Sequence, residues 1–416
     1  MHEAAAAAGP CRFCRTPLVH TFVDLGMSPL CQARVAPHQV SDMEALYPLH
    51  VWVCDRCLLV QLPAYVGAEA IFTEYAYFSS CADTWLRHAQ AYTEEMVARF
   101  GLGTHSQVVE LGSNDGYLLQ YFVARKIPVL GIEPAANVAC VAMGKGIPTL
   151  VKFFGDEVAR ELAGRGTRAD LLVGNNVLAH VPDLNGFVAG TKILLKPDGV
   201  ITMEFPHLMR LMEEDQFDTI YHEHFSYFSF LTVEQVFAAH GLTLFDVDEL
   251  STHGGSLRIY ARHAENQALP VGPRVAELRS REGTAGFRCL ERYASFGERI
   301  KRRKWELLDF LIRAKRAGKT IAGYGAPGKG NTLLNYCGIR TDFLDYTVDR
   351  NPYKQGTFTP GTRIPICHPD KVRETKPDYL LILPWNLKDE IMQQMACIRD
   401  WGGQFVVPIP KVQVYA

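Results

Sequence analysis

The stretch YHEHFSYFS, residues 221–229, gathers side chains that can transfer protons or hold a metal ion. Tyr221, His222, Glu223 and His224 stand next to one another, and neither helical nor strand periodicity requires that mixture. Histidine titrates near neutral pH, a neighbouring glutamate can orient it, and tyrosine can donate to a developing oxyanion. The stretch is therefore open to three interpretations: acid–base chemistry, metal binding, or a polar loop.

The spacing of the histidines gives metal binding little support. His222 and His224 stand at i and i+2, whereas the H-E-x-x-H motif places its histidines at i and i+4 on a helix, and no third ligand is obvious. The following stretch TVEQVFAAHG indicates a helix with Thr232 as N-cap and Gly241 at its end. We therefore interpret YHEHF as an acid–base loop that faces the carboxyl ends of a sheet.

Two C-x2-C pairs near the N-terminus have the spacing of a metal site. Cys11 and Cys14 form one pair, and Cys54 and Cys57 form the other. Four thiolates in two short knuckles predict a tetrahedral zinc site, which is structural because it has no open position. The apolar run LYPLHVWVC between the pairs suggests a small β ribbon.

The stretch SQVVELGSNDG, residues 106–116, predicts a strand followed by a tight turn, and YLLQYFVARK predicts the helix after it. Gly112 and Gly116 would let the backbone approach a ligand closely. The spacing E-x-G-x-N-D-G differs from the dinucleotide fingerprint and from the phosphate loop, and it offers no lysine to a phosphate. Acidic residues in the turn instead suit a cationic or uncharged ligand.

Two further segments repeat the strand pattern. IPVLGIEP ends in Glu133, at the position where an acidic residue accepts hydrogen bonds from ribose hydroxyls. ADLLVGNNVLAHVPDL carries Asn175, Asn176 and His180 at the end of a third strand. Alternating strands and helices predict a doubly wound parallel sheet, which binds its ligands outside the carboxyl ends of the strands.

The pieces VVELGSNDG, GIEP and NNVLAHVPD resemble the class I S-adenosylmethionine-dependent methyltransferases. The resemblance implies that Gly112 lines the methionine end of the cofactor, that Glu133 holds the ribose, and that Phe153 or Phe154 contacts adenine. A generic nucleotide-binding sheet is the alternative. The predicted cofactor-binding residues are Glu110, Gly112, Asn114, Asp115, Gly116, Glu133, Phe153, Phe154, Asn175 and Asn176.

A second glycine-rich turn lies in KTIAGYGAPGKGNTLLNYCGI, which predicts another strand–turn–helix unit. A helix N-terminus with glycines is suited to an anion, and Lys329 adds positive charge, so a diphosphate is the expected guest. A tight structural turn is the alternative. No acidic residue stands in this turn, which argues against a second methyl-donor site.

The order of the motifs supports a narrower resemblance that covers nearly the whole chain. The four-cysteine module, EYAYFSS, ELGSNDG, NNVLAHVPD, YHEHFSYFS, HGGSLRIY and GYGAPGKGNTLLNYCGI together resemble the nucleotide-sugar C-methyltransferases of deoxysugar biosynthesis. The resemblance implies methylation at C3 of a dTDP-linked 4-keto-deoxyhexose. It implies the catalytic residues Tyr75, His180, Tyr221, Glu223 and His224. The predicted substrate-binding residues are Tyr77, His253, Gly254, Tyr324, Lys329 and Asn331. The resemblance gives no role to His222.

The implied chemistry follows from the acidity of a carbon next to a ketone. His224, oriented by Glu223, or else Tyr221, would remove that proton, and donors such as Tyr221 or His180 would stabilise the enolate oxygen. The carbanion would then attack the sulfonium methyl group. An O- or N-methyltransferase is the second hypothesis, and a zinc-ribbon adaptor without activity is the third.

The expected fold class is α/β: a small zinc-ribbon-like β module, a central doubly wound class I methyltransferase domain and a C-terminal Rossmann-like α/β domain. We predict the zinc module at 1–78, the methyltransferase domain at 79–265, a helical connector at 266–318 and the nucleotide-sugar-binding domain at 319–416. The net charge of −2 over 416 residues argues against nucleic-acid binding. With no 18-residue apolar run and no signal-peptide pattern, we expect a cytoplasmic protein without membrane contact, as a monomer or weak homodimer.

Overall fold

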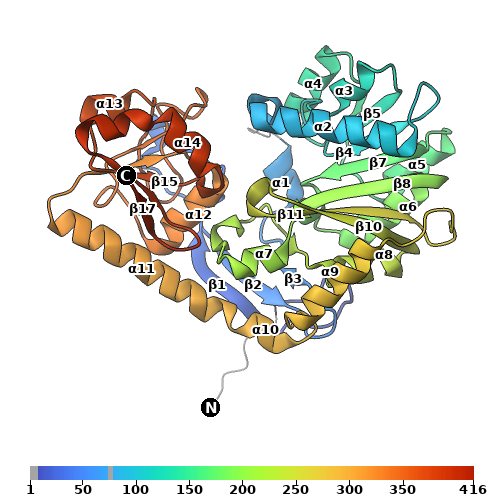
Figure 1. Cartoon of the computed structure of the whole chain (residues 1–416), viewed down its shortest axis with the longest axis horizontal. Coiled ribbons are helices and arrows are strands. Elements are labelled where there is room, and N and C mark those ends of the chain that lie inside the picture. Colours follow the sequence, from blue (N-terminus) through green and yellow to red (C-terminus); the bar gives the residue numbers. More distant parts are fainter. Residues whose placement is uncertain (1–7, 74–77) are drawn as a thin grey trace. The chain divides into compact units, whose positions relative to one another are not determined.

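The computed structural model describes residues 8–73 and 78–416, and the chain forms two compact units (Figure 1). The first unit comprises Met1–Val19, Val53–Leu208 and Glu223–Leu290, and the second comprises His20–Trp52, Met209–His222 and Glu291–Ala416. The two predicted active-site tyrosines, Tyr75 and Tyr77, lie outside the described residues. The domain boundaries given above stay a prediction.

A seven-stranded sheet forms the centre of the first unit, in the order β10-β11-β8-β7-β4-β5-β6. Its strands are β4 (Val108–Leu111), β5 (Val129–Ile132), β6 (Thr149–Leu150), β7 (Ala169–Asn175), β8 (Leu195–Pro206), β10 (Leu242–Leu250) and β11 (Ser256–His263). The strands from β6 to β8 run parallel, and β11 is antiparallel to both β8 and β10. The predicted doubly wound sheet is confirmed, with an antiparallel pair at one edge.

The buried residues of the parallel strands are mostly apolar because helices cover both faces of the sheet. All four residues of β4 are buried, including Glu110. Figure 1 shows α2, α3 and α4 on one side of the sheet and α5, α6 and α8 on the other. The helices of this unit are α1 (Ala68–Phe72), α2 (Asp83–Phe100), α3 (Leu119–Val123), α4 (Ala136–Gly144), α5 (Asp156–Gly164), α6 (Leu184–Leu194), α8 (Phe230–Ala239) and α9 (Pro273–Thr284), with the short 3-10 turns η2 (Ser79–Cys81), η3 (Leu178–His180) and η5 (Thr252–Gly254).

Helix α8 begins earlier than predicted. Its N-cap is Ser229, whose Oγ accepts a hydrogen bond from the Thr232 amide at 3.1 Å, so the assignment of Thr232 as the N-cap was wrong. The carboxylate of Glu282 in α9 accepts the Phe230 and Leu231 amides at 2.7 and 2.9 Å. A distant carboxylate thus satisfies the first free amides of the helix and moves its start upstream.

The two cysteine knuckles have matching backbones. The residue after each pair, Arg15 or Leu58, has a positive φ, and its amide donates to the carbonyl of the first cysteine at 3.0 or 2.9 Å. The chain then forms β3 (Val60–Gln61), which pairs antiparallel with β9 (Ser226–Tyr227). The pairing matches Gln61 with Ser226, so the knuckle is joined directly to the end of the YHEHF loop.

The second unit contains a six-stranded sheet in the order β14-β13-β12-β15-β16-β17. Its strands are β12 (Ile321–Tyr324), β13 (Thr347–Val348), β14 (Ile366–Cys367), β15 (Tyr379–Ile382), β16 (Gln404–Val407) and β17 (Gln413–Tyr415), of which only β17 is antiparallel to its neighbour. The remaining elements are β1 (His20–Ser28), β2 (Tyr47–Val53), α7 (Leu208–Glu213), α10 (Leu290–Ala294), α11 (Phe296–Arg316), α12 (Gly328–Cys337), α13 (Lys371–Thr375), α14 (Lys388–Gln394), η1 (Pro37–Gln39), η4 (Phe217–Thr219), η6 (Trp385–Leu387) and η7 (Ala396–Trp401). The predicted C-terminal α/β fold is confirmed.

Candidate active site

The turn after β4 brings the backbone close to the space where a ligand would lie. Gly112 and Gly116 have φ values of +64° and +77°, in the left-handed region that favours glycine. A Cβ atom at Gly116 would lie 2.3 Å from Ile147 Cδ1, so this position has no room for a side chain. Asn114 has a φ of +49° and donates its amide to Glu133 Oε2 at 2.9 Å.

Glu133 lies at the end of β5, as predicted, and ties two backbone segments together. Its Oε2 accepts the Asn114 amide and its Oε1 accepts the Ala135 amide, both at 2.9 Å. Each carboxylate oxygen retains a second lone pair for a ligand hydroxyl. Burial raises the pKa of Glu133 and raises that of Glu110, on β4, well above its ordinary value.

Two buried polar atoms in this turn, Ser113 Oγ and Asp115 Oδ1, meet no hydrogen-bond partner in the described part of the chain. Unpaired buried polar atoms are costly, so they indicate a ligand that supplies donors and acceptors. The ammonium, carboxylate, ribose and adenine groups of S-adenosylmethionine meet that requirement, and the turn fits this cofactor.

Two of the predicted cofactor residues also hold a neighbouring segment of the chain. Asn114 Oδ1 accepts the Ser79 amide at 2.9 Å, and Asp115 Oδ2 contacts the amide and hydroxyl of Ser80. Lys145 donates to the Asp115 carbonyl at 2.8 Å. The cofactor turn therefore anchors η2, which directly follows the aromatic EYAYF stretch.

The two phenylalanines predicted to contact adenine follow β6. Phe153 is 40% exposed, whereas Phe154 packs edge-on against Phe187 with ring centroids 5.4 Å apart. Phe153 is thus available to cover a ligand, and Phe154 mainly anchors its segment to α6.

His180 and His224 come together from two loops. His180 ends η3 just after β7, and its ring centroid lies 4.8 Å from that of His224. The Phe225 amide donates to the Ala179 carbonyl at 2.7 Å and fixes one loop on the other. Glu223 and His224 are only 4% and 7% exposed, whereas His180 is partly exposed.

The His180 ring is held in its neutral form. Burial lowers its pKa to about 4, although a hydrogen bond to the Glu223 backbone favours the charged form. Its Nδ1 atom has no partner among the described residues. A neutral ring whose Nε2 proton faces a backbone acceptor leaves Nδ1 with a lone pair, so His180 can accept a hydrogen bond but is a weak base.

The chain crosses from the second unit to the first within the motif, between His222 and Glu223. His222 is buried, donates from Nε2 to the Pro48 carbonyl at 3.2 Å and packs edge-on against Tyr47. These contacts indicate a structural role for His222. Tyr221 belongs to the second unit, as His222 does.

The HGG turn belongs to the same face of the first unit. His253 has a φ of +55°, and its Nε2 accepts a hydrogen bond from Asn176 Nδ2 at 3.0 Å. Its ring also packs against Trp85, with centroids 5.3 Å apart. Gly254 and Gly255 follow with φ values of +92° and +116°, so the turn depends on glycine there.

A buried carboxylate that the sequence did not single out supports this turn. Glu204, near the end of β8, accepts hydrogen bonds from Thr252 Oγ1 at 2.9 Å, His88 Nε2 at 2.8 Å and Arg258 Nη2 at 3.1 Å. Its carbonyl also accepts the Asn176 amide at 2.7 Å. The partners come from four separate elements, and no local motif could have revealed them.

The glycine-rich turn of the second unit is tightly packed. Gly325 has a φ of +87°, and a Cβ atom there would lie 2.6 Å from Pro384. Asp349, at the end of β13, accepts the Ala326 amide at 2.9 Å, much as Glu133 accepts that of Asn114. The turn itself has no acidic residue, but the neighbouring strand supplies one.

The three predicted residues of this turn differ in their surroundings. Lys329 Nζ donates to Asn386 Oδ1 at 3.0 Å and lies 4.7 Å from the Trp385 ring, and burial lowers its pKa. Tyr324 donates to Gln394 at 2.9 Å. Asn331 is buried and donates to the Cys31 carbonyl at 2.7 Å, which indicates a structural role.

The four predicted zinc ligands are brought together. Their sulfur atoms all lie within 4.8 Å of one another, with Cys11 and Cys57 at 3.6 Å and Cys14 and Cys54 at 3.4 Å. A tetrahedral zinc ion with Zn–S bonds of about 2.3 Å requires sulfur atoms roughly 3.8 Å apart. The cluster fits a structural zinc ion.

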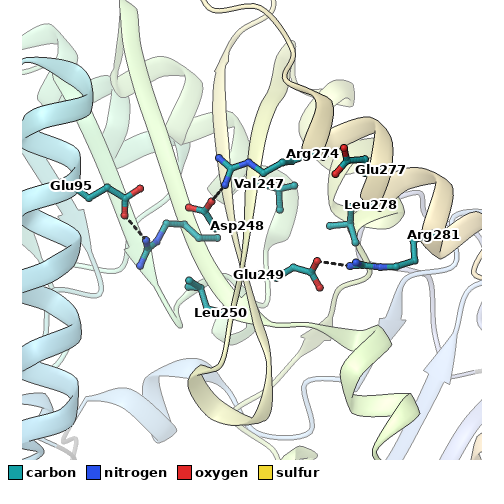
Figure 2. A pocket seen from close by; sticks show the side chains of 10 residues that line it. Glu95, Val247, Asp248, Glu249, Leu250, Arg274, Glu277, Leu278 and Arg281 are labelled. Carbon is teal, nitrogen blue, oxygen red and sulfur yellow. Dashed lines mark hydrogen bonds and ion pairs between the residues drawn. The ribbon is translucent and has the colours of Figure 1, made fainter.

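A cavity of about 440 Å³ lies beside β10 and α9, and neither His180 nor His224 lines it (Figure 2). Its three arginines each face a carboxylate of the lining: Arg281 pairs with Glu249 at 2.6 Å, Arg258 contacts Glu95 at 3.4 Å, and Arg274 contacts Asp248. Because each arginine already faces a carboxylate, we do not place the active site there.

Three family models match the chain in order. A zinc binding domain matches residues 11–72, a methyltransferase domain matches 85–247, and a C-methyltransferase C-terminal domain matches 251–410. Together with the sheet and the cofactor turn, they define the chain as an S-adenosylmethionine-dependent methyltransferase with a class I fold and a zinc-binding module.

The chain is 36% identical over 414 residues to the C-methyltransferase NovU of Streptomyces niveus, covering 100% of this chain and 98% of the relative. The chain therefore belongs to the C-methyltransferase family. This family membership favours transfer of the methyl group to carbon over the other two hypotheses, an O- or N-methyltransferase and an adaptor without activity.

Among solved structures, the PH0226 protein of Pyrococcus horikoshii OT3 matches at 14% identity and a TM-score of 0.37, covering 47% of this chain and 97% of its own. Magnesium protoporphyrin IX methyltransferase of Synechocystis PCC 6803 matches at 14% identity and a TM-score of 0.34, covering 42% and 82%. Scores this low add nothing to the argument. None of the helices within residues 8–73 and 78–416 is long and apolar enough to cross a membrane.

Proposed function

We propose that the protein transfers a methyl group to the carbon next to the ketone of a nucleotide-linked 4-keto deoxysugar, with His224 as the base. The observation that carries the proposal is the packing of His180 against the buried His224, with ring centroids 4.8 Å apart. Carbon acceptors must lose a proton before they become nucleophiles, and a buried imidazole is suited to remove it.

The two histidines would have different roles. The low pKa of His180, about 4, makes it a poor base, so proton removal would fall to His224. His180 Nδ1 would accept a hydrogen bond from a hydroxyl of the acceptor and orient it. The enolate oxygen would then need another donor, for which Tyr221 is the candidate.

The proposed reaction consists of proton removal followed by methyl transfer. His224 takes the proton, and the electrons of the broken C–H bond move into the enolate. S-adenosylmethionine supplies, when bound, an electrophilic methyl group on a positively charged sulfur. The acceptor carbon would form a bond to that methyl group while the carbon–sulfur bond breaks and S-adenosylhomocysteine leaves. The burial of His224 would limit the access of competing water.

The second unit contains a helix N-terminus suited to an anion, which supports a diphosphate as the group to which the sugar is linked. Helix α12 begins at Gly328, and its first turn presents backbone amides and a partial positive charge. Lys329 adds a cationic side chain, which lies 4.7 Å from the buried Trp385 ring. The particular nucleotide and the carbon numbering belong to the proposal.

The test is the exchange of the acceptor's α-proton in deuterated water, with a dTDP-linked 4-keto-deoxyhexose and S-adenosylhomocysteine. We expect His224→Asn to slow the exchange by roughly a hundredfold or more. His222→Gln is the matched control, because its amide can still donate to Pro48, and it should exchange as the wild type does. Equal exchange in His224→Asn and the wild type would refute His224 as the base.

A further inference from the structure

The first cysteine knuckle carries an arginine that points away from the metal site toward the catalytic loops. Arg12 Nη2 donates to the Leu62 carbonyl at 2.7 Å, and Nη1 lies 3.4 Å from Ser226 Oγ and 3.5 Å from the Val181 carbonyl. Ser226 follows the loop of His224, and Val181 directly follows His180. One side chain thus contacts both loops at once.

The backbone of Arg12 is itself fixed on the knuckle. Its amide donates to Gln61 Oε1 at 2.9 Å, and its carbonyl accepts Asn185 Nδ2 at 3.2 Å. Gln61 Nε2 in turn donates to Cys11 Sγ at 3.1 Å. Because the backbone of Arg12 is held by these hydrogen bonds, the guanidinium at the other end of the side chain has less freedom to move.

The guanidinium of Arg12 carries its charge between two backbone carbonyl groups and the ring of Phe225. The Phe225 ring lies 5.5 Å away, and burial lowers the pKa of Arg12 to about 10, so the group stays charged at neutral pH. A planar fork with several donors can hold two loops in register, which the single ammonium of a lysine does less well. Phe225 also binds Ala179 and Leu62 through its backbone.

We propose that Arg12 is a positioning residue that transmits the rigidity of the zinc knuckle to the loops of His180 and His224. The zinc module then has a role in catalysis although its metal takes no part in the chemistry. The inference rests on the proposed function only in naming these histidines as the reacting pair.

The experiment compares zinc-loaded, full-length Arg12→Lys and Arg12→Met with Arg15→Lys, a change at an exposed arginine of the same knuckle. Zinc per chain and the dissociation constant of S-adenosylmethionine are measured first, and both should equal those of the wild type. With a dTDP-linked 4-keto-deoxyhexose, kcat should fall roughly tenfold to a hundredfold in the Arg12 variants, as small misplacements of reacting groups do, with little change in KM.

A second readout does not depend on the acceptor. Ring signals of ¹³C-labelled histidine, assigned with His180→Gln and His224→Gln, should shift for both residues in the Arg12 variants and stay in place in Arg15→Lys. If the wild type does not turn over the sugar, the proposed function fails while the ring signals still decide on Arg12. Unchanged ring signals with zinc retained would overturn the inference, and so would loss of zinc in both Arg12 variants, because Arg12 would then only stabilise the knuckle.

Discussion

The buried carboxylate of Glu204 gives the sharpest prediction about stability. Glu204 has no exposed surface and accepts three hydrogen bonds, from His88, Thr252 and Arg258. The substitution Glu204→Gln keeps the shape of the side chain and removes its charge. Arg258, which is 3% exposed, then loses its close buried counter-ion.

Breaking a buried ion pair by removing one partner costs about 3–5 kcal/mol, because the remaining charge stays buried. Arg258 Nη1 keeps a second carboxylate, Glu95, at 3.4 Å, but that side chain is 46% exposed and compensates only in part. We therefore expect a cost at the lower end of this range. The free energy of the local unfolding that exposes the amides of β8 and β11 should fall by about 3 kcal/mol. At about 1.4 kcal/mol for each factor of ten, that loss is a roughly hundredfold change in the opening equilibrium.

The assay is hydrogen–deuterium exchange of peptides from β8 and β11, whose slowest amides should exchange roughly a hundredfold faster in Glu204→Gln. Glu249→Gln is the matched control, since Glu249 pairs with Arg281 at 2.6 Å with both side chains partly exposed, and it should cost at most about 1 kcal/mol. Replacing both partners, as Glu204→Gln with Arg258→Met, should recover much of the loss. Equal exchange in Glu204→Gln and Glu249→Gln would refute the reasoning.

Three further predictions concern the histidine, the cofactor turn and the metal. Because burial lowers the pKa of His180 from 6.5 to about 4, the unfolded chain binds more protons than the folded chain between these pH values, so the free energy of unfolding should fall by up to about 3 kcal/mol as the pH falls through that range. Urea titrations should show this loss in the wild type and a smaller one in His180→Gln. Gly116→Ala should weaken S-adenosylmethionine binding in calorimetry at least tenfold, whereas Gly166→Ala, with a similar φ of +84° and no atom within 4 Å of its Cβ, should not. Cys54→Ser should lower zinc per chain and the melting temperature together, and equal zinc in variant and wild type would contradict the four-thiolate site.

Local signals in the sequence predicted those parts of the site that depend on short-range chemistry. The paired cysteines, the glycine turn and the acidic residue at the end of β5 lie where the spacing indicated, because each is fixed by one turn or one strand end. The fold class followed from the same signals, since alternating strands and helices leave few topologies.

The contacts that join distant segments could not be predicted in this way. Glu282 moves the start of α8 from far along the chain, and Arg12 reaches loops that follow it by well over a hundred residues. The partners of Glu204 likewise come from separate elements, so no local pattern marks this residue. Side chains of this kind become visible only when the fold has placed them.

We propose that a carbon–carbon bond forms next to the ketone of a nucleotide-linked sugar. The most direct measurement is nuclear magnetic resonance of the product made from ¹³C-methyl S-adenosylmethionine and a uniformly ¹³C-labelled dTDP-linked 4-keto-deoxyhexose. We expect a one-bond carbon–carbon coupling between the new methyl group and the ring carbon adjacent to the ketone. A labelled methyl group without that coupling, or no transfer to the sugar while the protein binds S-adenosylmethionine, would contradict it.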